Sequence, residues 1–254
     1  MIEQSKHSTG QAALGHTRRV RISHWIVTAS FLTLAFSGVV ILMAHPRLYW
    51  GEVGNDLVPA LFELPIGRNH QHGGWGTRNS FLDGDPSAVT ASRTIRIFNE
   101  NGWGRSLHFL AAWLLVLPGA FYLLAGIFSG HFRRRLLPRM TEMTPRLFWH
   151  DLKDHLRKQM RPTAPGSPYG LMQKFAYCGV IFFVLPLMVV TGLAMSPAIT
   201  AAYPFLSAMF GGLQSARTVH FFAFVALLLF LFGHVAMVIR TGLKRQMRAM
   251  TLGE

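Results

Sequence analysis

The sequence contains little cysteine and little charge. A single cysteine, Cys178, excludes an internal disulfide, a cysteine-cluster metal site and the two-cysteine attachment of c-type haem. Any haem is therefore bound without thioether links. Only 14% of the 254 residues are charged and half are hydrophobic, whereas a soluble domain carries about 25% charged residues. The deficit of charge indicates that lipid, rather than water, surrounds much of the chain.

Acidic residues are fewer than basic ones, and the net charge is +14. Such an excess can indicate a nucleic-acid partner when it gathers on one soluble face. Here the basic residues gather at the ends of apolar runs, as is typical of membrane proteins. We therefore expect a lipid bilayer and no nucleic acid as the partner of this surface.

Four apolar runs are long enough to cross a bilayer, which takes about 20 residues of helix. They cover about 22–44, 107–129, 175–195 and 217–239. The first is too long for a signal peptide and lacks the small-residue cleavage pattern. The sequence predicts an all-α fold, in which residues 1–254 form a single integral membrane domain built on a four-helix bundle.

The distribution of Lys and Arg predicts the orientation. Eighteen lie in the two tails and in the inner loop 130–174, against seven in the outer segments. The positive-inside rule places both termini in the cytoplasm. The inner loop contains the basic amphipathic stretch TPRLFWHDLKDHLRKQM, which we expect to form a helix on the membrane surface. The outer loop 45–103 is too long for a simple connector. It is expected to be structured, either as a cap or as a docking surface.

Two histidines lie in the last span, 14 residues apart. On an α-helix, His220 and His234 are separated by about 21 Å along the axis and by roughly 40° around it. Both imidazoles therefore point to one side of the helix at different depths. One metal cannot bridge that distance, but two stacked cofactors can each use one of the two histidines.

Each cofactor then needs a second ligand at the same depth. The predicted orientation places His108 at the outer depth of His220 and His24 at the inner depth of His234. Two bis-histidine sites on four helices are typical of a cytochrome with two b-type haems. His45, at the outer end of the first span, is the alternative to His108 as the outer ligand.

Three of the four histidines follow an arginine by three residues, in RISH (21–24), RSLH (105–108) and RTVH (217–220). Residues i and i+3 share a helix face, so Arg21, Arg105 and Arg217 lie one turn nearer the membrane surface than their histidines. The planar guanidinium is suited to carboxylates. We expect these arginines to contact haem propionates, although arginine is also a common anchor at span ends.

These segments resemble a known family. RRVRISHW (18–25), LYWGEVGN (48–55), GWGRSLHF (102–109) and QSARTVHFFAF (214–224) are similar to segments of the dihaem cytochrome b membrane subunits of formate dehydrogenase, nickel–iron hydrogenase and thiosulfate reductase. The resemblance is strongest to subunits paired with a periplasmic molybdopterin oxidoreductase. It implies two non-covalent b-type haems on His24, His108, His220 and His234, in the inner membrane of a bacterium.

The resemblance also implies the activity. Electrons would pass between a periplasmic redox partner and quinone by way of the two haems, in a direction that the sequence leaves open. By analogy, the quinone site lies near the inner haem, with Gln173 and Lys174 as candidates and Arg21 nearby. Lys174 could equally be a lysine that extends to the membrane interface.

Two other functions are compatible with parts of this pattern. A stand-alone superoxide:quinone oxidoreductase shares the four spans and two haems but needs a positive outer funnel. The outer loop 45–103 carries five arginines and six acids, which argues against such a funnel. A passive anchor or metal transporter without haem would show no absorption band of b-type haem.

Overall fold

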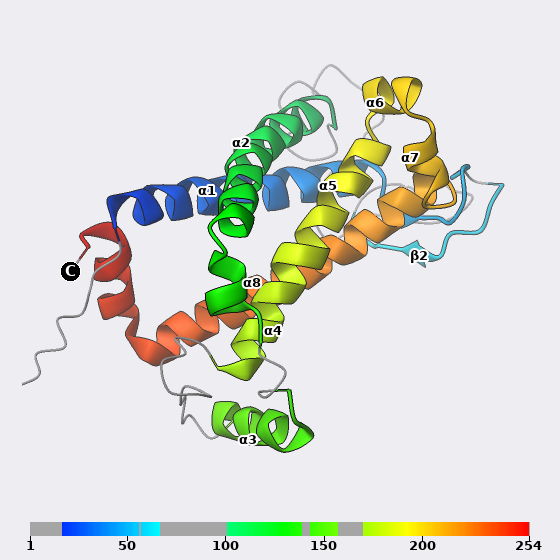
Figure 1. The fold of residues 1–254 in the computed structure, drawn as a ribbon. Coiled ribbons are helices and arrows are strands. Elements are labelled where there is room, and N and C mark those ends of the chain that lie inside the picture. The colour runs from blue at the N-terminus through cyan, green and yellow to red at the C-terminus, as the bar shows by residue number, and fades with distance from the viewer. Residues whose placement is uncertain (1–16, 56, 67–100, 139–142, 157–169, 254) are drawn as a thin grey trace, which may run out of the picture.

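Four long helices dominate the computed structural model, which describes residues 17–55, 57–66, 101–138, 143–156 and 170–253. The first two are α1 (Arg18–Ala44) and α2 (Asn101–Phe128). The third spans 171–194, and the last is α8 (Leu213–Thr251). All four are long and apolar enough to cross a membrane. This arrangement confirms the predicted all-α fold (Figure 1).

The third long helix contains a local irregularity. It consists of α4 (Leu171–Gly179), the π-helical turn η4 (Val180–Val184) and α5 (Leu185–Ala194). Pro186 lies in the first turn of α5 and lacks the N–H that an uninterrupted α-helix would use. A π turn inserts one extra residue without ending the helix. The span therefore continues past the proline.

The four helices form two pairs. Helix α1 packs mainly against α2, and α5 packs mainly against α8. Figure 1 shows these pairs as two crossings, with α8 extending along the molecule from the α7 end to the C-terminus. His108 on α2 and His220 on α8 thus belong to different pairs.

Residues 45–55, which we call the outer segment, connect the end of α1 to the start of α8 through hydrogen bonds. The terms outer and inner follow the orientation predicted from the basic residues. The Gly51 carbonyl accepts from the backbone N–H groups of Gln214 and Ser215, at 3.0 and 3.2 Å. The Glu52 carboxylate accepts from the N–H of Leu213 at 3.0 Å. The first N–H groups of a helix lack partners within the helix, so the outer segment caps α8.

Short elements complete the same end of the molecule. Strands β1 (Arg47–Leu48) and β2 (Phe62–Glu63) pair antiparallel, with Arg47 opposite Glu63. Helices α6 (Pro197–Ala202) and α7 (Phe205–Ala208) form the connection between α5 and α8. The described part of the long outer loop is therefore structured, as predicted, and residues 67–100 lie outside the described residues.

At the opposite, inner end, a π-helical turn η2 (Phe132–Leu136) follows α2, and helix α3 (Pro145–Leu156) precedes the third span. Helix α3 falls within the predicted amphipathic stretch. Its buried Asp151 accepts from the N–H of Met172 at 2.7 Å. The carboxylate therefore caps the first turn of α4 and fixes α3 to the start of the third span.

Helix α8 bends before it ends. Gly242 has φ 107° and ψ 86°, which is outside the helical region. The segment after it lies beside the start of α1, as Figure 1 shows at the red end of the chain. Arg21 Nη1 donates to the Thr251 carbonyl at 2.7 Å, and Trp25 Nε1 donates to the Met250 carbonyl at 3.0 Å. The C-terminal turns are thus fixed to the inner end of α1.

Candidate haem site

The structure brings the imidazoles of His108 and His220 together. Their ring centroids are 6.4 Å apart, and the ring planes are inclined by 59°. The two residues are 112 positions apart in sequence and come from different helix pairs. This is the outer pair that the depth argument predicts.

The separation fits one metal between two imidazoles. Metal–imidazole bonds such as Zn–N are about 2.0–2.1 Å long. With a distance of roughly 1.1 Å from ring nitrogen to ring centroid, two opposed ligands place their centroids about 6.3 Å apart. The inclination of 59° is compatible, because each ring can rotate about the axis through the metal. The two imidazoles could therefore both bind one haem iron.

The other nitrogen of each ring is occupied by a hydroxyl group. Ser37 Oγ on α1 lies 2.9 Å from His108 Nδ1. Thr191 Oγ1 on α5 lies 2.8 Å from His220 Nδ1. Ser37 and Thr191 are both completely buried. In each ring, Nε2 is then the nitrogen that remains for a metal.

The predicted inner pair, His24 and His234, lies on the inner halves of α1 and α8. The ring of His24 makes an edge contact with Trp25, at a centroid distance of 5.4 Å. The ring of His234 stacks on Phe230, at 6.3 Å and 20°. Trp25 also donates to the C-terminal segment, so His24 lies where the end of the chain meets α1.

The three predicted propionate arginines have different surroundings. Arg217 donates to the His45 carbonyl and, at 3.4 Å, to Gln214 Oε1. Arg105 is exposed near the start of α2. Arg21 donates to Thr251, yet its Nε is buried without a hydrogen-bond partner among the described residues. A donor is therefore still available on Arg21, one turn from His24.

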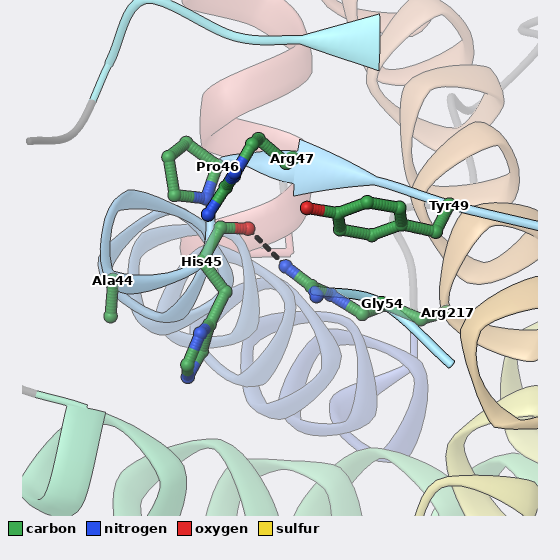
Figure 2. Close-up of a pocket in the computed structure, with 7 residues that line it drawn as sticks. All are labelled: Ala44, His45, Pro46, Arg47, Tyr49, Gly54 and Arg217. Atoms are coloured by element: carbon green, nitrogen blue, oxygen red, sulfur yellow. Dashed lines mark hydrogen bonds between the residues drawn. The ribbon is translucent and has the colours of Figure 1, made fainter. Parts of the chain in front are cut away.

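A small cavity of about 80 Å³ lies at the outer end of α8, one turn beyond His220. Figure 2 shows Arg217 and Tyr49 side by side in it, with the His45 carbonyl between them and Pro46. Tyr49 is 3% exposed, and its hydroxyl is buried without a hydrogen-bond partner among the described residues. Buried polar groups normally have a partner. A guanidinium and an unsatisfied hydroxyl together suit a carboxylate, which a haem propionate would supply.

His45 lies at the edge of this cavity. Loss of surrounding water lowers the pKa of His45 from its usual range, and the positive charges of Arg217 and Arg105 lower it further. Its side chain, which is partly exposed, points away from Arg217 in Figure 2. Because the ring centroid of His108 lies 6.4 Å from that of His220, the geometry favours His108 over His45 as the outer ligand.

The chain can be compared with known proteins. A family model described as prokaryotic cytochrome b561 matches residues 15–253. The chain belongs to the prokaryotic cytochrome b561 family. It is therefore a bacterial membrane protein that binds b-type haem and transfers electrons.

The chain is similar to the putative protein-methionine-sulfoxide reductase subunit YedZ1 from Azospira oryzae. It is 28% identical over 223 residues, which cover 88% of this chain and 89% of the relative. No solved structure matches the chain significantly.

The two quinone candidates of this cytochrome b561 family member lie at the start of α4. Gln173 Oε1 accepts from the N–H of Gly170 at 3.1 Å, so its side chain caps the helix. Lys174 is 4% exposed, unlike a lysine that extends freely to the interface. The ring of Tyr177, one turn further on, contacts Phe230 of α8 at 6.0 Å, and Phe230 stacks on His234. The first turns of α4 are therefore connected to His234 through two aromatic rings.

Ser37 and Thr191 are not among the residues predicted from the sequence. Each is followed by a glycine, and a Cβ on Gly38 or Gly192 would lie 3.5 or 3.6 Å from Cε1 of His108 or His220. A serine or threonine followed by glycine occurs in the first and third spans, and each of these spans precedes one that begins with an RxxH motif. This repeat is the signal that could have revealed the two hydroxyl residues.

Proposed function

We propose that this protein is a dihaem cytochrome b that transfers electrons across the membrane between quinone and a periplasmic redox partner. The proposal depends above all on the opposed imidazoles of His108 and His220, 6.4 Å apart. His220 and His234 share α8, which runs without a break between them. One helix can therefore supply an axial ligand at each of two depths.

In this proposal, His108 and His220 hold the outer haem, and His24 and His234 hold the inner haem. When bound, the two haems supply one-electron redox centres at two depths. Arg217 and Tyr49 provide donors at the outer end for a propionate, and the Nε of Arg21 provides one at the inner end. Arg105 contributes positive charge near the outer donors. The protein residues thus fix the position of each haem and neutralise its carboxylates.

We place the quinone site at the inner end, beside the first turns of α4. The side chain of Lys174 is buried and could provide a proton to a quinone bound there. Gln173 fixes the turn that carries it. The aromatic contact from Tyr177 to Phe230 and from Phe230 to His234 connects this region to the proposed inner haem.

The partner in this proposal is a periplasmic molybdopterin oxidoreductase. The name of the Azospira relative describes a reductase subunit, which favours electron flow from quinol to the partner. The outer segment and the residues that lead from it to β2 expose large apolar side chains, with Trp50 58% and Leu57 90% exposed. A partner of this kind would cover them, since large exposed apolar patches often mark interaction sites.

The decisive experiment is a reduced-minus-oxidised spectrum of the purified protein with pyridine haemochrome quantification. We expect two b-type haems per chain, both of which are reduced by a quinol. A protein that contains no haem would overturn the proposal. If the purified protein contained one haem per chain, the proposed outer site would be kept and the proposed inner site would be withdrawn.

A second measurement separates a subunit from a stand-alone enzyme. Quinol should reduce the haems of the purified chain. The reduced chain should not transfer electrons to the substrate of the partner enzyme until that partner is added. Reduction of quinone by the isolated chain with superoxide as the electron donor would instead favour a superoxide:quinone oxidoreductase.

A further inference from the structure

The environments of His108 and His220 repeat one arrangement. In both, the imidazole Nδ1 lies within hydrogen-bond distance of a buried hydroxyl on a neighbouring helix, at 2.9 Å for Ser37 and 2.8 Å for Thr191. The hydroxyl comes from the first helix of each pair, α1 or α5, and the histidine from the second, α2 or α8.

The direction of each hydrogen bond follows from the other contact of the hydroxyl. Ser37 Oγ donates to the Thr33 carbonyl at 2.7 Å. Thr191 Oγ1 donates to the Leu187 carbonyl at 2.7 Å. A hydroxyl has one proton to donate and can also accept. Because that proton is directed to the backbone, the oxygen must accept from the imidazole, so the proton of each ring lies on Nδ1.

Glycine follows the hydroxyl residue in both cases. Gly38 lies beside Cε1 of His108, and Gly192 lies beside Cε1 of His220. A Cβ at either glycine would already be in van der Waals contact with Cε1, so a larger side chain there would press on the imidazole. The glycine therefore leaves room for the ring, and the residue before it fixes the ring.

We propose that Ser37–Gly38 and Thr191–Gly192 are two copies of one half-site that positions the ligands of the outer haem. Ser37 and Thr191 hold His108 and His220 in the tautomer whose Nε2 is free to bind iron, and they fix the rotation of each ring. This inference rests on the proposed outer haem. Ser37 and Thr191 are positioning residues, because they act through the histidines and do not themselves touch iron.

Such a role has a measurable effect on the redox potential. A ligand histidine that donates its other N–H to an acceptor is a stronger donor to the metal, and loss of the acceptor typically weakens metal affinity or activity by 10–100-fold. A stronger donor favours ferric over ferrous iron. Removal of the acceptor should therefore raise the potential of the outer haem, by about 59 mV for each tenfold change in the ferric-to-ferrous affinity ratio.

The test compares Ser37→Ala and Thr191→Val with their conservative counterparts, Ser37→Thr and Thr191→Ser, which retain a hydroxyl. Thr33→Val is the matched control, because the Thr33 hydroxyl donates to Ala29 on its own helix at 2.8 Å. Each purified variant is titrated for the midpoint potentials of both haems. Its oxidised form is examined by electron paramagnetic resonance, which responds to the orientation of the axial rings.

We expect Ser37→Ala and Thr191→Val each to raise the potential of the outer haem and to shift its resonance, with the inner haem unchanged. The hydroxyl-retaining variants and Thr33→Val should match the unmodified protein. Unchanged outer-haem values in both hydroxyl-free variants, with both haems present, would overturn this inference alone. Absence of haem from the unmodified protein would overturn the proposed function. A shift in Thr33→Val as large as in Ser37→Ala would show a general packing effect and also overturn the inference.

Discussion

The imidazoles of His108 and His220 come from different helix pairs and lie together, with 6.4 Å between their ring centroids. Each pair, α1–α2 and α5–α8, contributes one imidazole and one hydroxyl to this contact. A haem bound there would therefore join the two pairs of the bundle. Since ligand binding to the folded state stabilises it, the outer site is expected to contribute to the assembly of the bundle as well as to electron transfer.

The first prediction concerns the assignment of ligands to haems. His220→Ala should remove the outer haem and leave the inner one, because His108 alone cannot supply both axial positions. His234→Ala should have the opposite effect. Pyridine haemochrome quantification should give one haem per chain in each variant, and the two remaining haems should differ in midpoint potential.

His45→Ala is the control for this assignment, because His45 is the alternative outer ligand. We expect the variant to retain two haems. If His45→Ala loses the outer haem and His108→Ala retains it, the outer ligand is His45, and the opposed pair in the structure has another role.

Much of this architecture can be predicted from the sequence, for clear physical reasons. A bilayer requires long apolar helices, so hydropathy locates four of them, and each helix starts only a few residues before its predicted span. Charges at the ends of the spans give relative depths, and depth alone is sufficient to match His108 with His220. Hydrophobic periodicity, by contrast, is weak in lipid-facing helices, so the pairing of α1 with α2 and of α5 with α8 was not predicted.

The details that escaped prediction depend on short-range geometry. Ser37 and Thr191 are small polar residues within spans, where such residues usually serve helix packing, and only the fold shows that they meet histidines. The bend at Gly242 lies among basic residues beyond the predicted last span, where no apolar pattern shows that the helix continues. The two-residue strands β1 and β2 are too short for any alternation to be recognised.

The second prediction concerns the unsatisfied hydroxyl of Tyr49. A buried polar group without a partner costs about 1–3 kcal/mol, so Tyr49→Phe should leave the haem-free protein as stable as before or more stable. If the hydroxyl donates to a propionate, the haem-loaded variant should be less stable than the loaded unmodified protein. Thermal unfolding should thus show that haem raises the unfolding temperature of the variant by less than it raises that of the unmodified protein.

Tyr203→Phe is the control for this experiment, because Tyr203 is 54% exposed and lies in the connection between α6 and α7. Haem should raise the unfolding temperature of this variant as much as that of the unmodified protein. If haem also raises the unfolding temperature of Tyr49→Phe by the same amount, Tyr49 is not part of the proposed carboxylate site.

The third prediction is a pH dependence from His45. Its pKa in the folded protein lies below the ordinary value of 6.5, so the unfolded chain binds a proton at His45 more readily than the folded protein does. The contribution of neutral His45 to stability is therefore present above pH 6.5 and is lost as the pH falls through the lowered folded pKa. The unfolding temperature of the unmodified protein minus that of His45→Gln should therefore decrease as the pH is lowered from about pH 7.5 to about pH 5.5.

A difference for His45→Gln that is constant over this range would show that His45 does not titrate differently in the folded and unfolded states.

The fourth prediction concerns the cap of α8. Gly212 has φ 122° and ψ 169°, a conformation almost restricted to glycine. A Cβ at this position would lie 2.5 Å from the carbonyl carbon of Gly51 and 2.6 Å from the Glu52 nitrogen. Gly212→Ala should therefore displace the outer segment from α8. Limited proteolysis should cut the outer segment faster, and the outer haem should be lost more readily than the inner one.

Gly119→Ala in α2 is the matched control, because a Cβ at Gly119 would meet nothing within 4 Å among the described residues. This variant should keep the proteolysis pattern and both haems. Equal proteolysis of Gly212→Ala and the unmodified protein would show that the segment can shift to accept the added carbon.

The last prediction tests the orientation from which the terms outer and inner derive. Leu57 is 90% exposed on the outer side, and Leu252 is 61% exposed at the end of the C-terminal segment. In a Cys178→Ser background, a membrane-impermeant thiol reagent applied to intact spheroplasts should label Leu57→Cys and leave Leu252→Cys unlabelled until the membrane is opened. The eighteen basic residues of the tails and inner loop require this result under the positive-inside rule. The opposite labelling would reverse the bundle and place His24 and His234 nearer the periplasm, so that a periplasmic partner would meet the end at which α8 meets α1.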